Sequence, residues 1–180
     1  MDTIYSTTHI ANYFVYRAKT EGKSLTPLKV QKLVYFTHGW FLAEHTSPLI
    51  NELVQAWDSG PVFSSLYHRL KKYGNQPITQ LEGDSIFKDS STYDSIIPMI
   101  SLSDTEAAET LDFAWKAYGD IDEANLAEHT RVQGTPWHQV VTEQKYSSGF
   151  LPKGKEIEND RIKRYFEDQI KILAAEKAAD

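Results

Sequence analysis

Three polar side chains, Gln31, Tyr35 and His38, lie four and three residues apart within a strongly apolar stretch. At about 100° per residue these positions share one side of a helix. An amide, a phenol and an imidazole offer hydrogen-bond donors and acceptors of defined geometry, which suits a binding pocket or a contact with a partner. They could equally be buried polar groups bonded to neighbouring backbone, which is the usual state of polar groups in a protein interior.

The sequence has none of the patterns that would place these residues in a known catalytic or metal-binding arrangement. No two of the six histidines are four residues apart, and cysteine is absent, which excludes disulfides, thiol nucleophiles and cysteine-based zinc sites. No phosphate-binding loop, nucleophile elbow or dinucleotide fingerprint occurs. We therefore expect no catalytic residue, no metal site and no cofactor, and we expect that the protein is not an enzyme.

Composition and charge predict one cytoplasmic domain. The 180 residues are 41% hydrophobic and 24% charged, which is ordinary for a globular domain. The chain does not start like a secretory signal, and no stretch approaches the roughly 20 apolar residues of a membrane span. The net charge is −6, and the basic residues gather only in a small cluster, Arg69, Lys71 and Lys72. Nucleic-acid binders usually carry a larger basic face, so DNA binding is disfavoured.

The stretch that carries the three polar residues predicts a central, buried helix over about residues 27–45. Thr26 followed by Pro27 is typical of a helix cap and a first helical position. Apolar residues then fall on all sides of the helical wheel, as in a helix surrounded by other elements. Lys29 and Lys32 are expected to be solvated near the helix start. The fold class that follows is mostly α, a single-domain helical bundle around this helix.

Shorter elements are predicted around the central helix. A short strand lies near 52–57, and Pro61 takes the first position of a helix that follows it. Residues 75–102 are interpreted as loops with a candidate strand that would pair with residues 52–57. Further helices are expected near 6–21, 104–118, 122–130, 136–144 and 158–178.

The four tryptophans divide into two pairs. Trp40 and Trp115 are predicted to pack in the core, where aromatic side chains dominate burial. Trp57 and Trp137 each border a turn or a helix start that contains a proline. Each of them could belong to the core or stand at the surface as an anchor of a protein interface, and the sequence leaves both interpretations open.

Two sequence blocks resemble the SocA-like, phage-associated Panacea-domain family. The first is LTPLKVQKLVYFTHGW at residues 25–40, and the second is AWDSGPV at residues 56–62, followed by Tyr67. Their combination, in this order and spacing, is what makes the resemblance specific. It covers about residues 6–166, which we predict to be the antitoxin-like domain, and residues 167–180 are predicted to be a C-terminal helical extension.

The resemblance implies an antitoxin that neutralises a cognate protein toxin by binding it, with a toxin that differs from one family member to another. It brings no catalytic residues with it. The candidate partner-binding residues come from the two blocks, from the residue after them and from a later tryptophan: Gln31, Lys32, Tyr35, His38, Trp57, Gly60, Pro61, Val62, Tyr67 and Trp137.

Other functions stay open at this point. One branch of the family acts as adaptors that deliver a toxin to a protease. The basic cluster and the phage setting suggest a DNA-binding or regulatory protein. An enzyme could use the row of Gln31, Tyr35 and His38, or the turn at residues 57–61, as a pocket. Self-association is possible in each case.

The stretch of residues 103–130 is strongly acidic, with eight Asp or Glu residues against Lys116. Such a surface could meet a basic toxin and speed its capture. A solvated helix face is the more common origin of such charge.

Overall fold

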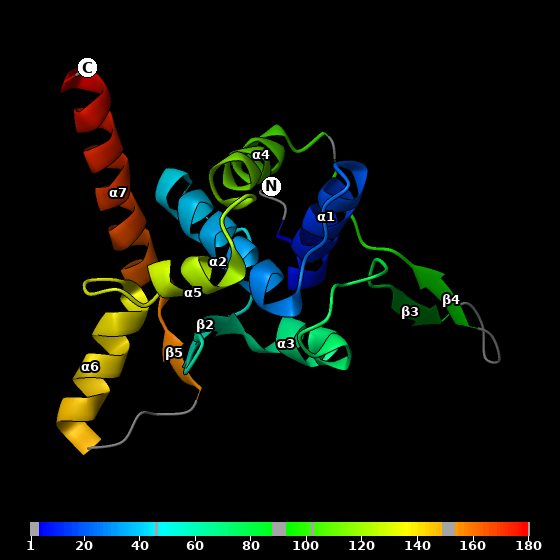
Figure 1. Cartoon of the computed structure of the whole chain (residues 1–180), viewed down its shortest axis with the longest axis horizontal. Coiled ribbons are helices and arrows are strands. Elements are labelled where there is room, and N and C mark those ends of the chain that lie inside the picture. Colours follow the sequence, from blue (N-terminus) through cyan, green and yellow to red (C-terminus); the bar gives the residue numbers. More distant parts are fainter. Residues whose placement is uncertain (1–3, 46, 88–92, 102, 149–153, 180) are drawn as a thin grey trace.

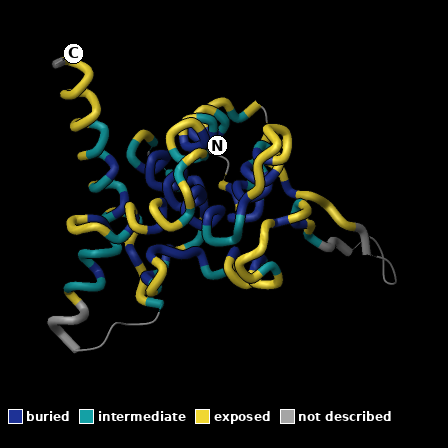
Figure 2. The backbone as a smooth tube through the Cα atoms, in the orientation of Figure 1, coloured by how far each residue is buried: buried dark blue, intermediate teal, exposed yellow. Residues whose placement is uncertain are grey.

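The computed structural model describes residues 4–45, 47–87, 93–101, 103–148 and 154–179, and helix α2 (Pro27–Glu44) runs through its centre (Figure 1). The Thr26 side chain accepts the backbone N–H of Lys29, and Pro27 takes the first helical position. Every residue from Lys29 to Leu42 is buried, as Figure 2 shows along the tube. The prediction of a central helix that is apolar on all sides is confirmed.

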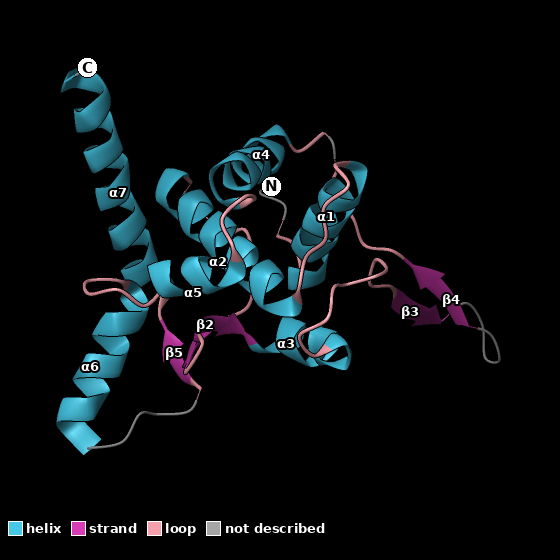
Figure 3. Cartoon of the chain, in the orientation of Figure 1, coloured by secondary structure: helices cyan, strands magenta, loops and turns pink. Residues whose placement is uncertain are grey.

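Helices from both ends of the chain surround α2. Those packed directly on it include α1 (Thr7–Thr20), α4 (Thr105–Tyr118), α5 (Glu123–His129) and α7 (Asn159–Ala179). The remaining helical segments are α3 (Ser64–Leu70), a 3-10 turn (Lys71–Tyr73) and α6 (Pro136–Ser148). The mostly α fold class with a short-strand element is therefore confirmed (Figure 3).

The contact between α2 and α7 depends on a glycine. A Cβ atom at Gly39 would lie 2.1 Å from the ring of Phe166, so a larger residue there would push α7 away. The Phe166 ring is 1% exposed and packs edge-on against Trp40, with 5.0 Å between the ring centroids. Such close approach of two helices places aromatic packing at their interface.

A small antiparallel sheet lies beside the start of α2. Its strands are β1 (Val54–Trp57), β2 (Gly60–Phe63) and β5 (Lys155–Ile157), in the order β2-β1-β5. The predicted short strand near 52–57 is thus confirmed. The prediction that Pro61 starts a helix is wrong, because Gly60, at φ +102°, closes a hairpin turn and Pro61 pairs with Ala56.

Strands β3 (Asp84–Phe87) and β4 (Tyr93–Ile96) form a separate two-stranded hairpin (Figure 1). The expectation that a strand from residues 75–102 would pair with residues 52–57 is therefore wrong. The physical reason is that both edges of β1 are already occupied, by β2 on one side and by β5 on the other.

Trp40 and Trp115 are 6% and 4% exposed, which confirms that both belong to the core. Within the part of the chain that the structure describes, no helix is long and apolar enough to cross a membrane. The C-terminal helix α7 continues through residue 166 without a break, and its last turns are exposed (Figure 2). The domain division at that residue stays a prediction.

Candidate functional site

The two family-like sequence blocks meet in space, because Lys32 of the first block binds the Pro61 carbonyl of the second. Beside this contact, the side chain of Gln31 binds the backbone of Phe63, the residue that follows the second block at the end of β2. The Gln31 Nε2 atom donates to the Phe63 carbonyl at 3.0 Å, and its Oε1 atom accepts the Phe63 N–H at 3.1 Å. A glutamine amide that pairs with a peptide group in both directions acts like one more rung of the sheet. Gln31 thus fixes the β1–β2 hairpin onto α2.

Lys32 lies beneath the turn of the same hairpin, and the prediction that Lys29 and Lys32 are solvated is wrong. They are 7% and 0% exposed, because the hairpin and α5 cover the first turns of α2. Lys32 Nζ donates to the Pro61 carbonyl at 3.0 Å. Burial, and then repulsion from Arg131, lowers the pKa of Lys32 to about 7. A Cβ atom at Gly60 would lie 2.9 Å from Nζ, so this glycine makes room for the ammonium group.

His38 connects α2 to the first residue of α7. Its Nε2 atom lies 3.1 Å from Asn159 Oδ1, which it reaches as a donor when the ring carries its proton there. The His38 ring also packs edge-on against Phe63 at 5.6 Å between centroids. Because the side chain is fully buried, its pKa is lowered to about 4. His38 is therefore neutral at pH 7 and holds β2 and α7 on the same helix.

Tyr35 fills the space between α2 and α7. Its ring packs edge-on against Phe166 at 6.1 Å, and burial raises the pKa of its hydroxyl. Among the described residues, the Tyr35 hydroxyl and His38 Nδ1 have no hydrogen-bond partner. The interpretation as buried groups bonded to backbone therefore holds for Gln31 alone. His38 instead forms a hydrogen bond with the Asn159 side chain, and Tyr35 packs against α7 by its ring.

Three of the ten candidate residues form a partly exposed aromatic surface at the end of the hairpin, which we call the hairpin tip: Trp57, Tyr67 and Trp137. Tyr67 is 42% exposed and its ring centroid lies 4.7 Å from that of Trp57. Trp137, from the first turn of α6, donates its indole N–H to the Trp57 carbonyl at 2.8 Å. Elements distant in sequence therefore bring these aromatic side chains to one surface.

The other seven candidates lie behind that surface. Gly60, Pro61 and Val62 are buried in β2, and Gln31, Lys32, Tyr35 and His38 are buried in α2. The structure brings Lys32 and Gln31 into direct contact with β2, while Tyr35 faces α7 instead. The ten residues therefore form an aromatic tip and the buried support beneath it.

Residues that the sequence reasoning missed also hold the tip. Arg131 donates to the Asp58 carbonyl at 3.4 Å and to Glu128 Oε2 at 2.7 Å, so the loop after α5 lies against the turn. Asn159 is the partner of His38. No local sequence pattern marks either residue, because their partners lie 73 and 121 positions away in the sequence.

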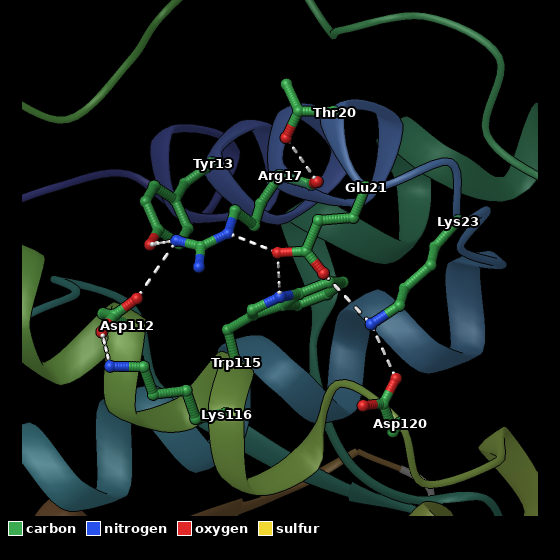
Figure 4. A network of polar contacts seen from close by, with 9 residues as sticks. All are labelled: Tyr13, Arg17, Thr20, Glu21, Lys23, Asp112, Trp115, Lys116 and Asp120. Atoms are coloured by element: carbon green, nitrogen blue, oxygen red, sulfur yellow. Dashed lines mark hydrogen bonds and ion pairs between the residues drawn. The ribbon is translucent and has the colours of Figure 1, made fainter.

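Much of the acidic stretch is engaged within the fold. The Asp112 carboxylate lies 3.1 Å from Arg17 Nη1 and 2.6 Å from Lys116 Nζ, and Lys23 Nζ lies 2.7 Å from the Asp120 carboxylate. Figure 4 shows these contacts. In addition, two aspartates cap helices: Asp104 caps α4 and Asp122 caps α5. The solvated-face interpretation is thus too simple for these four residues, since each has an intramolecular role.

Two residues of the basic cluster, Arg69 and Lys72, are also paired within the molecule. Arg69 lies 2.6 Å from Asp84, and Lys72 lies 2.9 Å from Glu82, which is 6% exposed. Such pairing leaves less positive charge for phosphate contacts. No group of three or more His, Cys, Asp or Glu residues suited to a metal ion occurs in the described ranges.

Comparison with known proteins places all ten candidate residues inside a matched stretch. Residues 30–138 match the model of the family described as "Antitoxin SocA-like, Panacea domain". The chain is also 28% identical over 132 residues to Antitoxin SocA of Caulobacter vibrioides (strain NA1000 / CB15N), an alignment that covers 73% of this chain and 68% of that protein. No solved structure matches the chain.

Proposed function

The chain belongs to the family of SocA-like antitoxins with a Panacea domain, and from that premise we propose that it neutralises a cognate protein toxin by binding it directly. Membership confirms the resemblance that the two sequence blocks indicate. It supports an antitoxin role in general terms and suggests a role other than catalysis. We propose in addition that the toxin is bound directly and that the hairpin tip is the surface that binds it.

The observation that carries the proposal is the hairpin tip. Large aromatic side chains at a surface are typical anchors of protein interfaces, because they bury much area and have few rotatable bonds. The tip is also held rigidly, since Gln31 and Lys32 bind the backbone of β2 from below. A surface fixed before the partner arrives loses less conformational entropy on binding.

The closed packing of the polar row favours this function over an enzyme with a pocket at the same place. Gln31, Tyr35 and His38 are 4%, 2% and 0% exposed. A substrate could reach them only if the hairpin or α7 moved away from α2. Instead, Gln31 holds β2 of the hairpin against α2, and Tyr35 and His38 contact α7.

The proposal is tested by co-expressing the chain with the product of its neighbouring gene in bacteria. We expect that the neighbour alone arrests growth, that co-expression restores growth, and that the two proteins co-purify at a fixed ratio. A neighbour that is harmless alone and leaves no complex would contradict the proposal. Measuring the amount of toxin separates direct inhibition, in which it persists, from delivery to a protease, in which it disappears.

The hairpin tip is tested by a matched pair of tyrosine variants. Tyr67 and Tyr16 are 42% and 53% exposed, but Tyr16 lies on α1, away from the tip. We expect Tyr67→Ala to weaken the affinity for the toxin by roughly tenfold, as for an interface anchor, and Tyr16→Ala to leave it unchanged. Equal affinities for both variants would remove the tip from the interface while leaving the antitoxin role intact.

A further inference from the structure

A groove of about 490 Å³ lies at the C-terminal end of α2, between α4 and the outer turns of α7. It is formed at the opposite end of α2 from Lys32 and the hairpin. Figure 1 shows the C-terminal half of α7 extending beyond the other helices, and its residues are exposed in Figure 2. Both α4 and α7 pack on α2, so the groove has a firm floor.

The walls of the groove are two helical stripes. On α4 the wall runs from Glu106 to Phe113, and on α7 from Ile170 to Lys177. On each helix the lining residues follow the spacing i, i+3, i+4 and i+7, which brings them onto one face. Two such faces over a shared floor have the form that receives a third helix in ridge-into-groove packing.

The inner part of the groove is apolar and lacks the cover that the rest of the core has. Phe113 and Leu173, one from each wall, are 43% and 42% exposed. Beneath them Trp40 packs edge-on against Phe113 at 5.3 Å. An apolar helix face placed here would bury both side chains, which favours binding.

The rim of the groove is acidic on the side of α2 and α4. Glu44, Glu106 and Glu109 contribute three carboxylates, and the Nδ1 atom of His45 lies 3.6 Å from a carboxylate oxygen of Glu106. Lys177 stands at the outer end of the α7 wall. A ligand helix with basic residues along one flank would therefore be attracted to the α4 side and would be favoured over an acidic one.

We propose that this groove is a second docking surface, which binds an amphipathic helix of a partner protein with an apolar stripe and a flank of Lys or Arg. The apolar stripe lies between Phe113 and Leu173, and the basic flank faces Glu106 and Glu109. The inference concerns a surface remote from the hairpin tip and does not depend on which face of the chain binds a toxin.

The test uses the whole protein and a synthetic helical peptide of about 18 residues, long enough to form a helix on its own. Its leucines follow the i, i+3, i+4, i+7 spacing and lysines flank them. A second peptide has glutamate in place of each lysine. We expect the lysine peptide to bind at least tenfold more tightly than the glutamate peptide, as measured by fluorescence anisotropy.

Two neighbouring residues of α7 supply the decisive variants. Leu173 lines the groove and Ile172 does not, although they are 42% and 50% exposed. Leu173→Asp should weaken binding of the lysine peptide roughly tenfold, while Ile172→Asp should change it less than twofold. A general attraction between opposite charges would instead be strengthened by either new carboxylate. Equal melting temperatures would show that both variants stay folded.

Two outcomes would overturn the proposal. The first is equal binding by the Leu173→Asp and Ile172→Asp variants, which would place the peptide elsewhere. The second is a dimer of the protein alone, seen by sedimentation velocity, that Leu173→Asp dissociates. In that case the occupant of the groove is a second copy of this chain and not a basic helix of another protein.

Discussion

The two ends of α2 contact the rest of the molecule in opposite ways. At the N-terminal end, polar side chains are buried and bind the backbone of a hairpin, as Gln31 and Lys32 do. At the C-terminal end, apolar side chains of α4 and α7 border an open groove, and Leu173 is 42% exposed. Polar residues that the sequence suggests as binding residues therefore support the fold, whereas apolar residues that the sequence suggests as core residues are exposed at a surface.

The largest expected difference between the closed region, where α7 packs on α2, and the open groove is in the stability that their side chains contribute. Two residues of α7 allow this comparison within one helix. Phe166→Ala should lower the free energy of unfolding by about 3–5 kcal/mol, because the ring is 1% exposed between α2 and α7. Leu173→Ala, farther along the same helix, should change it by less than about 0.5 kcal/mol. Urea unfolding followed by far-UV circular dichroism measures both. Similar losses would mean that the groove is closed in solution.

The buried histidine should make the closed region sensitive to acid. The pKa of His38 is lowered to about 4 in the folded protein, from 6.5 in the unfolded chain. Between these pH values the unfolded chain binds a proton that the folded protein does not, so stability falls as pH falls, by about 3 kcal/mol in all. His38→Gln should remove this dependence, because an amide does not titrate.

The measurement is urea unfolding of the wild type and of the His38→Gln variant at pH 7, 5.5 and 4.5, with His68→Gln as control. His68 is exposed on α3, outside the polar row. We expect the wild type and the His68→Gln variant to lose stability in parallel and the His38→Gln variant to lose less. Three parallel profiles would mean that His38 is not sealed from water.

A smaller effect is expected on the alkaline side, from Lys32. Its pKa is lowered to about 7 in the folded protein, from 10.5 in the unfolded chain. Between these pH values Lys32 binds a proton in the unfolded chain but not in the folded protein. The free energy of unfolding therefore rises with pH, by about 1 kcal/mol per pH unit. Between pH 7 and pH 9 the wild type should therefore gain about 2 kcal/mol relative to Lys32→Met, which keeps the volume and removes the charge.

Unfolding at pH 7, 8 and 9 tests this, and Lys71→Met is the matched control, because Lys71 is an exposed lysine of the 3-10 turn. The Lys71→Met variant should follow the wild type at every pH. A Lys32→Met profile parallel to the wild type would show that the ammonium group reaches water through the hairpin.

The sequence predicts the elements of this fold better than their contacts. Helix α2 follows from Thr26, Pro27 and an apolar surface on all sides, all of which are local signals. Strand β5 has no such signal, because Lys155–Ile157 is a three-residue strand that forms by pairing with β1. The burial of Lys32 was missed for the same reason, since the hairpin that covers it is 29 residues away.

The candidate site shows the same limit. The two family-like blocks point to the right region, because Lys32 of the first block and Pro61 of the second are in direct contact. The sequence does not separate Tyr67, which is exposed, from Val62, which is 3% exposed, because both are large apolar or aromatic residues and only the packing of the fold decides which of them is covered. The groove was missed entirely, because its walls combine Phe113 and Leu173 from helices whose pairing no local pattern encodes.

The link between His38 and Asn159 has a consequence for biosynthesis. These residues are 121 positions apart, and α7 supplies one side of the shell around α2. A ribosome must therefore complete nearly the whole domain before the apolar surface around Tyr35 is covered. Until then the nascent chain exposes the apolar side of α2 that α7 covers, which is the kind of surface that chaperones hold. Folding of this domain should thus finish only after α7 has been synthesised, with the docking of α7 as the closing step.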